Sequence, residues 1–592
     1  MVEARFDDLR PGRERSFRLV EPLGSVQARE PSAVPDALDR VEAAVGRGLW
    51  AGGFVAYEAA PGLDPALTVR STRHPSDPLR GLPLVWFGLF RRCERVPPLR
   101  PEAHGPVDRD LGWRPSVGRE QYEDAVSLIR ERIAAGDTYQ VNHTFRLRTR
   151  VPGSPVELYR DLCLAQRGGY AAFLDAGGYL VLSASPELFL RIEGDRITTR
   201  PMKGTTPRGR WPAEDARAAR ALQRSSKDRA ENAMIVDLLR SDLGRIARPG
   251  TVRADPMFEA ERYETLWQLT STITGATRPG TRLRDVFAAL FPSGSVTGAP
   301  KVAAMRLICE LEDSPRGIYC GSIGYLAPEG SGEPRANLNV AIRTVVLDRR
   351  SGAAEYGVGG GITYDSSSSG EYREALAKTR VLTARRPEFQ LLETILHRGR
   401  GGFRHLHEHL ARLRGSAGYF GFALDPEAVE LRLKQARAEL GDADGLVRLL
   451  LARDGTVQVR IRPRPAPHPG PVTVALDTDP VDPSDVWLFH KTTLRERYER
   501  RRAARPDVDD VLLINTRGEV TESTIANLAV RLDGRWVTPP LASGLLPGAY
   551  RDRLVRGGRL RERPISLEEV SAAPGLALVN SARGWRSARL RG

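Results

Sequence analysis

A chain of 592 residues is too long for one hydrophobic core, and its length predicts two to four domains. Apolar residues make up 41% of the chain, which excludes a disordered protein, and no apolar run approaches the roughly 20 residues that cross a bilayer. The net charge of +15 would suit a nucleic-acid-binding protein, but the arginines are spread among acidic residues, so we expect a solvated surface and neither a nucleic-acid nor a membrane partner.

The N-terminus and the cysteines indicate whether the protein is secreted and whether it depends on zinc or disulfides. Residues 1–20 are charged throughout and lack the apolar core of a signal peptide, so we expect a cytoplasmic protein. The four cysteines, Cys93, Cys163, Cys309 and Cys320, show no CxxC spacing. The sequence therefore predicts neither a zinc site nor a disulfide framework.

The predicted elements fall into two stretches. The first 118 residues are rich in proline and arginine, with strand-like runs at 52–58 and 84–90. Hydrophobic periodicity then predicts helices at 120–135, 226–246, 282–290, 301–312 and 371–383, and strands at 139–148, 170–174, 179–183, 188–192, 318–325, 337–347 and 354–358. Segregated strands and helices are typical of a layered α+β domain. An arginine- and proline-rich junction at 384–387 precedes a second α+β unit that starts at 388.

Lysine is scarce in this chain. Of the 89 basic residues, 83 are arginine, and the six lysines are Lys203, Lys227, Lys301, Lys378, Lys434 and Lys491. An amine can lose its proton and attack a carbon atom, whereas a guanidinium group stays protonated. Since five of the six lysines lie within the motifs described below, we expect some of them to carry chemistry.

Two predicted helices carry carboxylates three residues apart, which puts each pair on one helix face. The pairs are Asp228 with Glu231 and Glu371 with Glu374, and the second pair follows the glycine-rich run 357–361. Carboxylates from two helices can hold Mg²⁺ while leaving positions open for a substrate carboxylate. Spacing of this kind is also common on solvated helix surfaces.

Six further blocks accompany these helices in a fixed order, at 136–142, 183–189, 200–205, 291–301, 316–325 and 341–344. Together they closely resemble the chorismate-utilising family, which includes anthranilate, isochorismate, salicylate and aminodeoxychorismate synthases. The resemblance covers about residues 119–384 and implies a layered α/β sandwich, with 1–118 as its variable N-terminal part. It implies that Glu231 and Glu374 bind Mg²⁺, supported by Asp228 and Glu371. It also implies that chorismate is held by Thr297, Tyr319, Arg343, Lys378 and the backbone near Gly360.

Lys203 distinguishes among the members of this family, because the aminating synthases that lead to 4-aminobenzoate carry lysine there. Two displacements explain how an amine enters at C4 with retention: Lys203 attacks C2, and ammonia then attacks C4 and expels the lysine. Glu187 is the candidate general acid for the departing hydroxyl. Gln140 lies where the water-adding relatives have a lysine base, which favours ammonia as the nucleophile. Gln268 lies where many relatives have a histidine, so we assign no residue to the contact that this histidine makes near the C4 hydroxyl.

The ammonia source is not apparent in this sequence. A glutaminase of the usual kind needs a nucleophilic cysteine in a Gly-x-Cys-x-Gly turn, and none of the four cysteines lies in one. We therefore expect a separate glutamine amidotransferase subunit as partner.

The second half carries five ordered blocks, at 390–395, 405–413, 489–493, 518–527 and 544–551. They resemble the fold-type IV pyridoxal-phosphate enzymes, which include D-amino-acid aminotransferases and aminodeoxychorismate lyases. The resemblance implies a D-amino-acid aminotransferase-like α+β fold over 388–592 and the cofactor pyridoxal 5'-phosphate, and it allows a homodimer through this domain. Lys491 would form the Schiff base, Glu522 would pair with the pyridine nitrogen, and Asn527 would assist. The phosphate would be bound by Arg412 and by the Ala549 and Tyr550 amides at a helix start.

The substrate side of this second site would be lined by Ser581 and Arg583. The three histidines His405, His407 and His409 are interpreted as helix surface. Taken together, the halves predict conversion of chorismate to 4-amino-4-deoxychorismate and then to 4-aminobenzoate. An alternative is an anthranilate-type synthase fused to a fold-type IV aminotransferase, against which Lys203 and Gln140 argue. A nucleic-acid-binding protein with decayed enzyme domains is disfavoured by the intact metal, nucleophile and Schiff-base positions.

Overall fold

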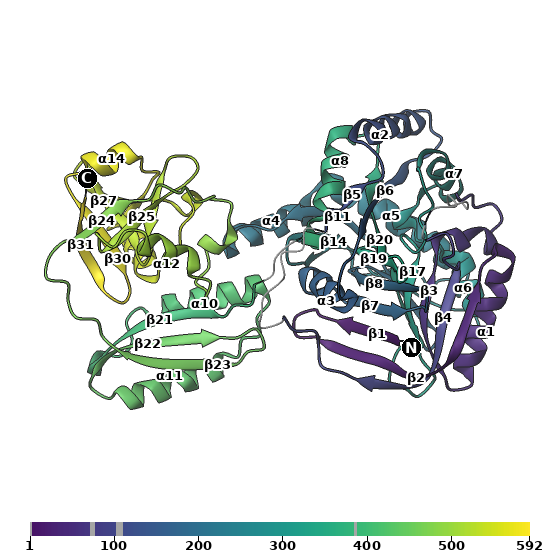
Figure 1. Cartoon of the computed structure of the whole chain (residues 1–592), viewed down its shortest axis with the longest axis horizontal. Helices are drawn as coiled ribbons and strands as arrows, with labels where there is room; N and C mark the ends of the chain where they lie inside the picture. The colour runs from purple at the N-terminus through teal and green to yellow at the C-terminus, as the bar shows by residue number, and fades with distance from the viewer. Residues whose placement is uncertain (1–2, 71–76, 78, 102–110, 384–386, 592) are drawn as a thin grey trace. The chain divides into compact units, whose positions relative to one another are not determined.

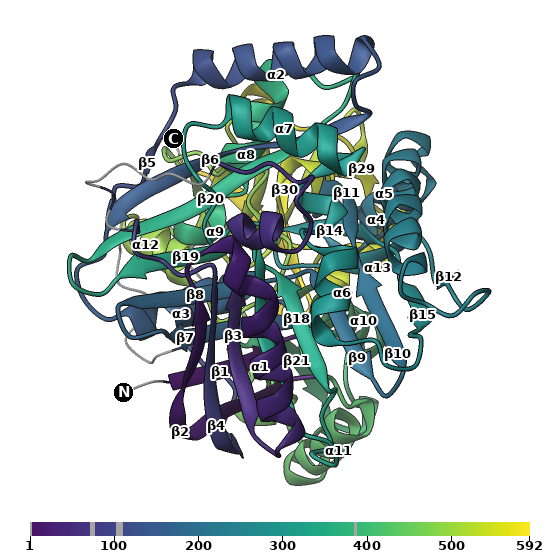
Figure 2. The same ribbon diagram turned by 90° about the vertical axis from the view of Figure 1, so that its right-hand side faces the viewer.

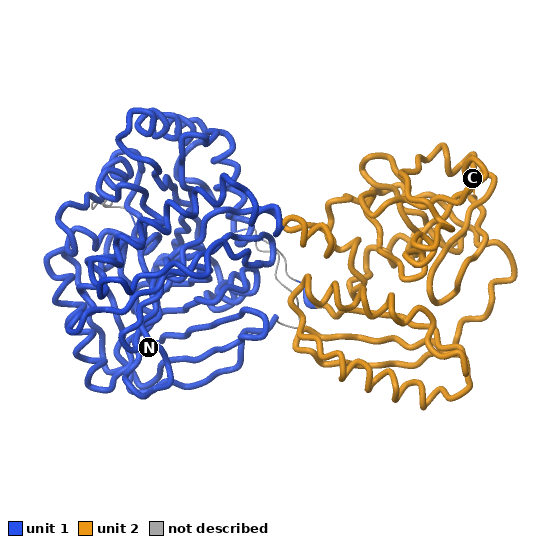
Figure 3. The backbone as a smooth tube through the Cα atoms, turned by 180° about the vertical axis from the view of Figure 1, so that it is seen from behind, with its two compact units in different colours: residues 1–207, 219–388 blue, residues 208–218, 389–592 orange. Residues whose placement is uncertain are grey.

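The computed structural model describes the chain except for residues 1–2, 71–76, 78, 102–110, 384–386 and 592. The chain forms two compact units (Figure 3). Unit 1 comprises Met1–Pro207 and Ala219–Glu388, and unit 2 comprises Arg208–Ala218 and Phe389–Gly592. Sequence analysis assigned residues 208–218 to the core at 119–384, so their membership of unit 2 is a difference that the amino-acid pattern does not reveal.

Unit 1 is built on a large antiparallel sheet system flanked by helices (Figures 1 and 2). Its strands are β1 (Glu3–Asp8), β2 (Arg15–Ala28), β3 (Trp50–Val55), β4 (Val85–Arg95), β5 (Arg114–Pro115), β6 (Gln140–Arg150), β7 (Tyr170–Asp175), β8 (Tyr179–Ser185), β9 (Leu188–Glu193), β10 (Arg196–Arg200), β12 (Arg253–Ala254), β15 (Ile273–Ala276), β16 (Gly298–Ala299), β17 (Ser322–Leu326), β18 (Ala336–Val340), β19 (Thr344–Asp348) and β20 (Ala353–Ile362). A small second sheet has the order β11 (Met202–Pro207), β14 (Leu266–Thr270), β13 (Glu259–Arg262).

The helices of unit 1 cover the sheets. They are α1 (Val34–Gly46), α2 (Arg119–Ala134), α3 (Pro155–Gln166), α5 (Ser226–Gly244), α6 (Leu283–Leu290), α7 (Lys301–Leu311), α8 (Ser368–Ala377) and α9 (Arg380–Thr383). Helices α2 and α8 pack side by side against β6 and β20 (Figure 2). Helix α5 begins at a serine cap, because the Ser225 side chain accepts a hydrogen bond from the Asp228 amide. This cap sets the phase of the helix that carries Asp228 and Glu231.

The N-terminal region belongs to the same sheet system, through the pairs β1–β2, β2–β4, β3–β4, β17–β3 and β1–β7. Sequence analysis missed β1 and β2. The 14-residue strand β2 contains Pro22 and Gly24, where its register against β4 shifts. Because a proline and a glycine inside a strand mark a bulge, the hydrophobic alternation there is interrupted and the strand was not detected.

Unit 2 has a three-stranded and an eight-stranded sheet. The first is β21 (Leu391–Arg398), β22 (Asp444–Leu451) and β23 (Val457–Pro463), packed on α10 (Leu406–Phe420) and α11 (Pro426–Leu440). The second contains β24 (Val472–Leu476), β25 (Asp510–Ile514), β26 (Val520–Ser523), β27 (Asn527–Leu532), β28 (Arg535–Thr538), β29 (Arg561–Glu562), β30 (Leu576–Asn580) and β31 (Gly584–Leu590). The remaining helices are α12 (Glu496–Ala503), α13 (Ala549–Arg556) and α14 (Leu567–Ala572).

In the larger sheet of unit 2, β26 pairs with both β25 and β27, so six strands close into a ring: β26, β25, β24, β31, β30 and β27. Helix α4 (Pro212–Arg224) begins within the part of the chain assigned to unit 2. The mixed α and β content confirms the expected α+β fold class. Among the described residues, no helix is long and apolar enough to cross a membrane.

Candidate active sites in the two units

Unit 1 contains a cavity of about 370 Å³, which gathers residues from both halves of its sequence. The predicted site residues that line it are Glu187, Lys203, Asp228, Glu231, Tyr319, Arg343, Gly360, Glu371, Glu374 and Lys378. They come from β11, α5, β20, α8 and from loops and helix ends elsewhere in unit 1. The cavity therefore brings together residues that lie up to 236 positions apart in the sequence, from Asn142 to Lys378.

Glycines in β20 create the space for two of these side chains. A Cβ at Gly357 would overlap with the Tyr319 ring, and a Cβ at Gly361 would overlap with the Lys203 amine. Only a residue without a side chain allows such close approach. The glycine-rich run thus lets the side chains of Tyr319 and Lys203 pack directly against the backbone of β20.

Lys203 lies on β11 with its amine enclosed beside Gln140 and Gly361. Burial lowers its pKa from the usual value, because an ammonium group loses hydration there, while Glu231 opposes this shift. The Asn232 amide donates to the Lys203 carbonyl at 3.4 Å and so supports the strand. This environment favours a neutral amine that can act as a nucleophile.

Gln140 is fully buried, and among the described residues neither its amide nitrogen nor its amide oxygen has a hydrogen-bond partner. A buried carboxamide without a hydrogen-bond partner lowers the stability of the protein, unless a polar molecule binds to it. Gln140 does not itself line the cavity. Its amide nitrogen and the Lys203 amine both lie against Gly361, since a Cβ added at that glycine would lie 2.7 Å from the amide nitrogen and would overlap with the amine. The position suits recognition of a small polar molecule close to Lys203.

Glu187 provides an acid on the same cavity. Burial raises its pKa to about 7, while a hydrogen bond from Ser295, 2.6 Å from Oε1, opposes the rise. A carboxyl group with this pKa holds its proton in part of the molecules near neutral pH. Sequence analysis missed Ser295, although it lies within the block 291–301.

The four acidic residues proposed as metal ligands share this cavity, but they are partly engaged with protein groups. Glu374 pairs with Lys378 at 3.0 Å, and Glu371 accepts a hydrogen bond from Ser366 at 2.7 Å. Burial raises the pKa of Glu371, and Glu374 adds to the rise. Among the residues that the structure describes, no three His, Cys, Asp or Glu side chains are gathered as a ready metal site.

The chemistry of this donor set nevertheless fits Mg²⁺. The ion usually keeps several waters and takes only one or two carboxylates from the protein. A cation between α5 and α8 would offset the burial and the repulsion by Glu374 that together raise the pKa of Glu371. The residues present therefore fit such an ion, whose remaining positions would be filled by water and a substrate carboxylate.

The lining of the cavity differs from the sequence-based expectation at Thr297 and adds a contact at Gln268. Thr297 does not line the cavity, because its hydroxyl donates to the Ser293 carbonyl at 3.0 Å. Gln268, for which no contact was assigned, does line the cavity and donates to the Thr205 hydroxyl at 3.0 Å. The Thr297 bond is local, whereas the Gln268 bond joins the paired strands β14 and β11.

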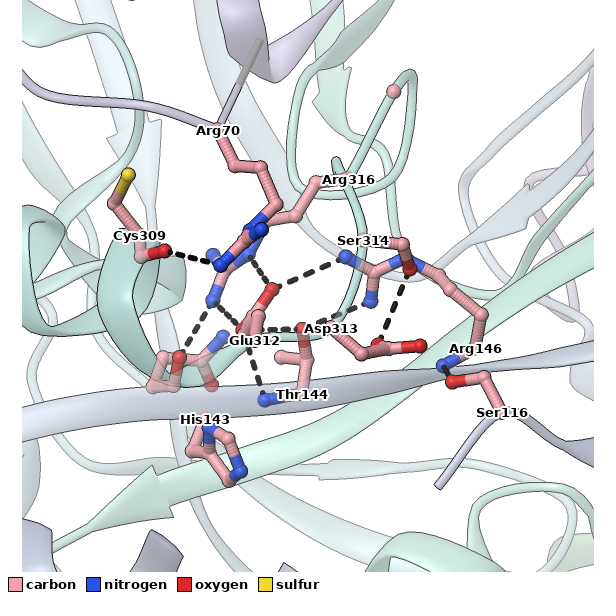
Figure 4. Close-up of polar contacts among 12 residues, drawn as sticks. Arg70, Ser116, His143, Thr144, Arg146, Cys309, Glu312, Asp313, Ser314 and Arg316 are labelled. Carbon is pink, nitrogen blue, oxygen red and sulfur yellow. Dashed lines mark hydrogen bonds and ion pairs between the residues drawn. The ribbon is translucent and has the colours of Figure 1, made fainter. Parts of the chain in front are cut away.

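A buried ionic network supports one wall of the cavity (Figure 4). Glu312 accepts hydrogen bonds from Arg146 at 3.1 Å and Arg316 at 2.6 Å, and these cations hold its pKa at about 2. Arg316 also donates to the carbonyls of Val296, at 2.7 Å, and Asn142, at 2.6 Å, both of which line the cavity. Sequence analysis assigned no role to these charges, since single buried ions have no periodic signature.

Unit 2 contains a second cavity, of about 290 Å³. The predicted residues that line it are Arg412, Lys491, Glu522, Asn527, Ala549, Ser581 and Arg583, whereas Tyr550 does not. Lys491 lies beside β21, where its carbonyl accepts a hydrogen bond from the Leu392 amide at 2.9 Å. Burial lowers the pKa of Lys491 to about 7, and the cations Arg412 and Arg495 contribute.

Glu522 lies on β26 on the same cavity. Burial raises its pKa to about 8, and the Asn527 amide donates to it at 3.1 Å. A Cβ at Gly548 would overlap with the Asn527 side chain, so this contact requires glycine at 548. Three features of this cavity suit pyridoxal phosphate. The Glu522 carboxyl group suits the ring nitrogen, and the Lys491 amine, which readily loses its proton, suits the aldehyde. The helix start at Ala549 suits the phosphate.

His409 corrects the interpretation of the three histidines as helix surface. It is 2% exposed and lines the cavity, and its ring contacts Glu393 at 2.6 Å and Ser581 at 2.7 Å. Glu393 also accepts two hydrogen bonds from Arg412, at 2.9 and 2.6 Å. The spacing of three residues between His409 and Arg412 on α10 could have indicated this shared face.

In the proposed phosphate site, Tyr550 would act only through its backbone amide in the first turn of α13. The helix begins at Ala549, with Gly548 as its N-cap, so the first backbone amides point out of the helix start. The Tyr550 ring instead stacks on His405, with centroids 5.0 Å apart and an interplanar angle of 21°. The expected helix start is thus present, and the tyrosine side chain lies outside the cavity.

Comparison with known proteins finds two families along the chain. Residues 14–384 match the description "chorismate binding enzyme", and residues 390–590 match "Amino-transferase class IV". The chain is 44% identical to an aminodeoxychorismate synthase of Streptomyces griseus, over 47% of this chain and 37% of that protein. It is 40% identical to an anthranilate synthase component 1 of Streptomyces coelicolor, over 47% of this chain and 53% of that protein. The chain thus spans roughly a third to a half of the length of these relatives.

A solved structure supports the fold of unit 1. The crystal structure of anthranilate synthase component I from Streptococcus pneumoniae superposes with a TM-score of 0.53 and 26% sequence identity. The match covers 62% of this chain and 92% of that one. The fusion of two halves that the sequence motifs predict is confirmed by the two family matches.

Proposed function

Because the chain belongs to the family of chorismate binding enzymes, we propose that unit 1 aminates chorismate and that unit 2 eliminates pyruvate from the product, giving 4-aminobenzoate. The observation that carries the proposal is the enclosed Lys203 amine on the same cavity as the acid Glu187. The aminodeoxychorismate synthase of Streptomyces griseus, 44% identical over the matched part, supports the amination step.

In unit 1, Lys203 attacks C2 of chorismate as the two conjugated ring double bonds shift and the C4 hydroxyl leaves with a proton from Glu187. Ammonia then bonds to C4, both double bonds shift back, and the C2–nitrogen bond to Lys203 breaks. The net change exchanges the hydroxyl for an amine and releases water. Mg²⁺ held by Glu231 and Glu374, with Asp228 and Glu371 beside them, would neutralise a substrate carboxylate.

Gln140 is the residue that receives ammonia in this proposal. Its unpartnered carboxamide oxygen accepts a hydrogen bond from ammonia and leaves the nitrogen lone pair free. A glutamine amidotransferase is proposed as the ammonia source. On the substrate, Arg343, Tyr319 and Lys378 bind carboxylate and hydroxyl groups.

In unit 2, pyridoxal phosphate bound to Lys491 would supply an electron sink for cleavage at the substrate's C4–H bond. Lys491, whose pKa burial lowers to about 7, would take that proton, and Glu522 on the same cavity would pair with the ring nitrogen. Ser581 and Arg583 line the substrate side, where Arg583 can bind a carboxylate. Loss of pyruvate then leaves an aromatic amine.

An anthranilate-type synthase fused to an aminotransferase is the second candidate, since an anthranilate synthase component 1 is 40% identical over a similar span. One assay separates the two. Purified protein is incubated with chorismate, Mg²⁺, ammonium and pyridoxal phosphate, and the products are resolved by chromatography. We expect 4-aminobenzoate and pyruvate in equal amounts, whereas anthranilate as the aromatic product would overturn the proposal.

A further inference from the structure

The segment Arg208–Asp215 packs on the part of unit 2 that precedes Lys491. The Trp211 ring lies 5.1 Å from the Phe489 ring, at an interplanar angle of 32°. The Arg210 guanidinium lies over both rings, at 4.7 and 5.5 Å from their centroids, and donates to the Pro483 carbonyl at 3.1 Å. Aromatic and cation–π contacts of this kind fix a side chain's position as well as burying it.

A buried ion pair holds the segment in shape. Arg208 and Asp215 approach to 2.7 Å, with side chains 6% and 7% exposed. The same guanidinium lies 4.2 Å from the Tyr419 ring centroid, and the Tyr419 hydroxyl donates to the Gly209 carbonyl at 2.8 Å. A Cβ at Gly209 would overlap with the Asp215 backbone, so the turn requires glycine. The segment is therefore an ordered part of unit 2.

The segment reaches the cofactor site through His490, the residue before Lys491. The imidazole Nε2 of His490 lies 3.2 Å from the Arg210 carbonyl, and its Nδ1 lies 2.9 Å from the Ser416 hydroxyl. Because a carbonyl only accepts, Nε2 carries the proton and Nδ1 accepts from Ser416. Burial lowers the pKa of His490 to about 3, so the ring stays neutral. His490 lines the cavity beside Lys491.

From these contacts we infer that Arg208–Asp215 is a positioning segment for Lys491, which acts by fixing the tautomer and orientation of His490. The inference rests on the proposed role of Lys491 as the residue that bonds to the cofactor. Along the chain, the segment directly follows β11, the strand that carries Lys203. The polypeptide of the first site thus continues into a structural part of the second.

Trp211→Ala in the full-length protein tests the inference, because it removes the stacking on Phe489 and leaves every cavity residue in place. Three quantities are measured. They are the pH titration of the bound cofactor's visible absorbance without substrate, hydrogen exchange of the peptide 488–495, and turnover of supplied 4-amino-4-deoxychorismate. We expect the titration midpoint to shift, exchange to rise severalfold, and kcat to fall about tenfold. Ammonia-dependent chorismate consumption should stay within about twofold.

Trp211→Phe should restore all three quantities, because it keeps a ring on Phe489. Arg217→Ala is the matched control, since Arg217 is an exposed residue two positions beyond the segment and its removal should leave them unchanged. An unaltered titration and unaltered exchange in Trp211→Ala would overturn the inference, even if the melting temperature fell, because the segment would then be structural only. If the wild type fails to turn over 4-amino-4-deoxychorismate, the proposed function fails, while titration and exchange still test the segment.

Discussion

The guanidinium carbon of Arg146 lies 5.2 Å from the centroid of the Tyr319 ring, and both side chains are buried. Arg146 is held by Glu312, which also binds Arg316, so the tyrosine that lines the first cavity rests on an ionic network (Figure 4). A cation on one ring face restricts the ring to one orientation. The cavity wall therefore depends on charges that never touch the substrate.

We expect Arg146→Gln to raise KM for chorismate more than it lowers kcat, because Tyr319 loses its support while the reacting groups remain. The free energy of unfolding should fall by about 3 kcal/mol, since one partner of a buried ion pair is removed while Arg316 still compensates Glu312. Arg148→Gln on the same strand is the control. Its pair with Glu355 is half exposed on the arginine side and should contribute less than about 1 kcal/mol. Equal effects from both substitutions would contradict the assigned role.

Substitution of the proposed metal ligands should affect the reaction of unit 1 and leave the cofactor of unit 2 unchanged. Glu231→Gln and Glu374→Gln should each abolish Mg²⁺-dependent chorismate consumption, because an amide is a weaker, neutral ligand. The visible absorbance of the bound cofactor in unit 2 should not change. The measurement is chorismate loss against Mg²⁺ concentration, and full activity in either variant would rule out these ligands.

Lys203 can be tested by charge-conserving replacement. Lys203→Arg keeps the positive charge but removes the nucleophile, because guanidinium stays protonated. Neither Lys203→Arg nor Lys203→Ala should form 4-amino-4-deoxychorismate, and the alanine variant should admit water to the bound ring. Mass spectrometry of the wild type incubated with chorismate but no ammonia should detect a lysine–substrate adduct. Amination by Lys203→Arg at near the wild-type rate would mean that Lys203 acts by charge alone.

The amination step should depend on pH through Glu187. Its pKa is about 7, and only the protonated acid can donate to the departing hydroxyl, so the rate should fall about tenfold per unit well above pH 7. Ser295 stabilises the carboxylate by its hydrogen bond and lowers the pKa. Ser295→Ala should therefore move the alkaline limb to higher pH. Initial rates between pH 6 and 9 check this, and a limb that moves to lower pH would contradict the assignment.

Lys491→Ala should uncouple the two reactions. The cofactor loses its covalent link to the protein, so the visible absorbance of the purified variant should change, and 4-amino-4-deoxychorismate should accumulate in place of 4-aminobenzoate. Unit 1 provides the internal control, because chorismate consumption should continue. Formation of 4-aminobenzoate at the normal rate would show that another residue acts as the base.

Much of the element pattern could be predicted from the sequence. The helices at 120–135 and 226–246 correspond to α2 and α5 within two residues, since both have clear helical periodicity. The single helix expected at 371–383 is instead α8 and α9, because the chain leaves helical geometry between Lys378 and Arg380. Strands β1 and β2 were both missed, and in β2 the register shifts at Pro22 and Gly24.

By itself the sequence determined the two halves and their families, and most of the site residues that it predicted line the two cavities, because motifs such as 200–205 and 518–527 combine residue type with spacing. Only the tertiary structure decided that His409 is buried on Glu393, that Arg146 supports Tyr319, and that Arg208–Ala218 belongs to unit 2. The physical reason is that these features depend on contacts between residues distant in the chain. Burial, charge pairing and ring stacking across such distances have no local periodicity from which a pattern could be recognised.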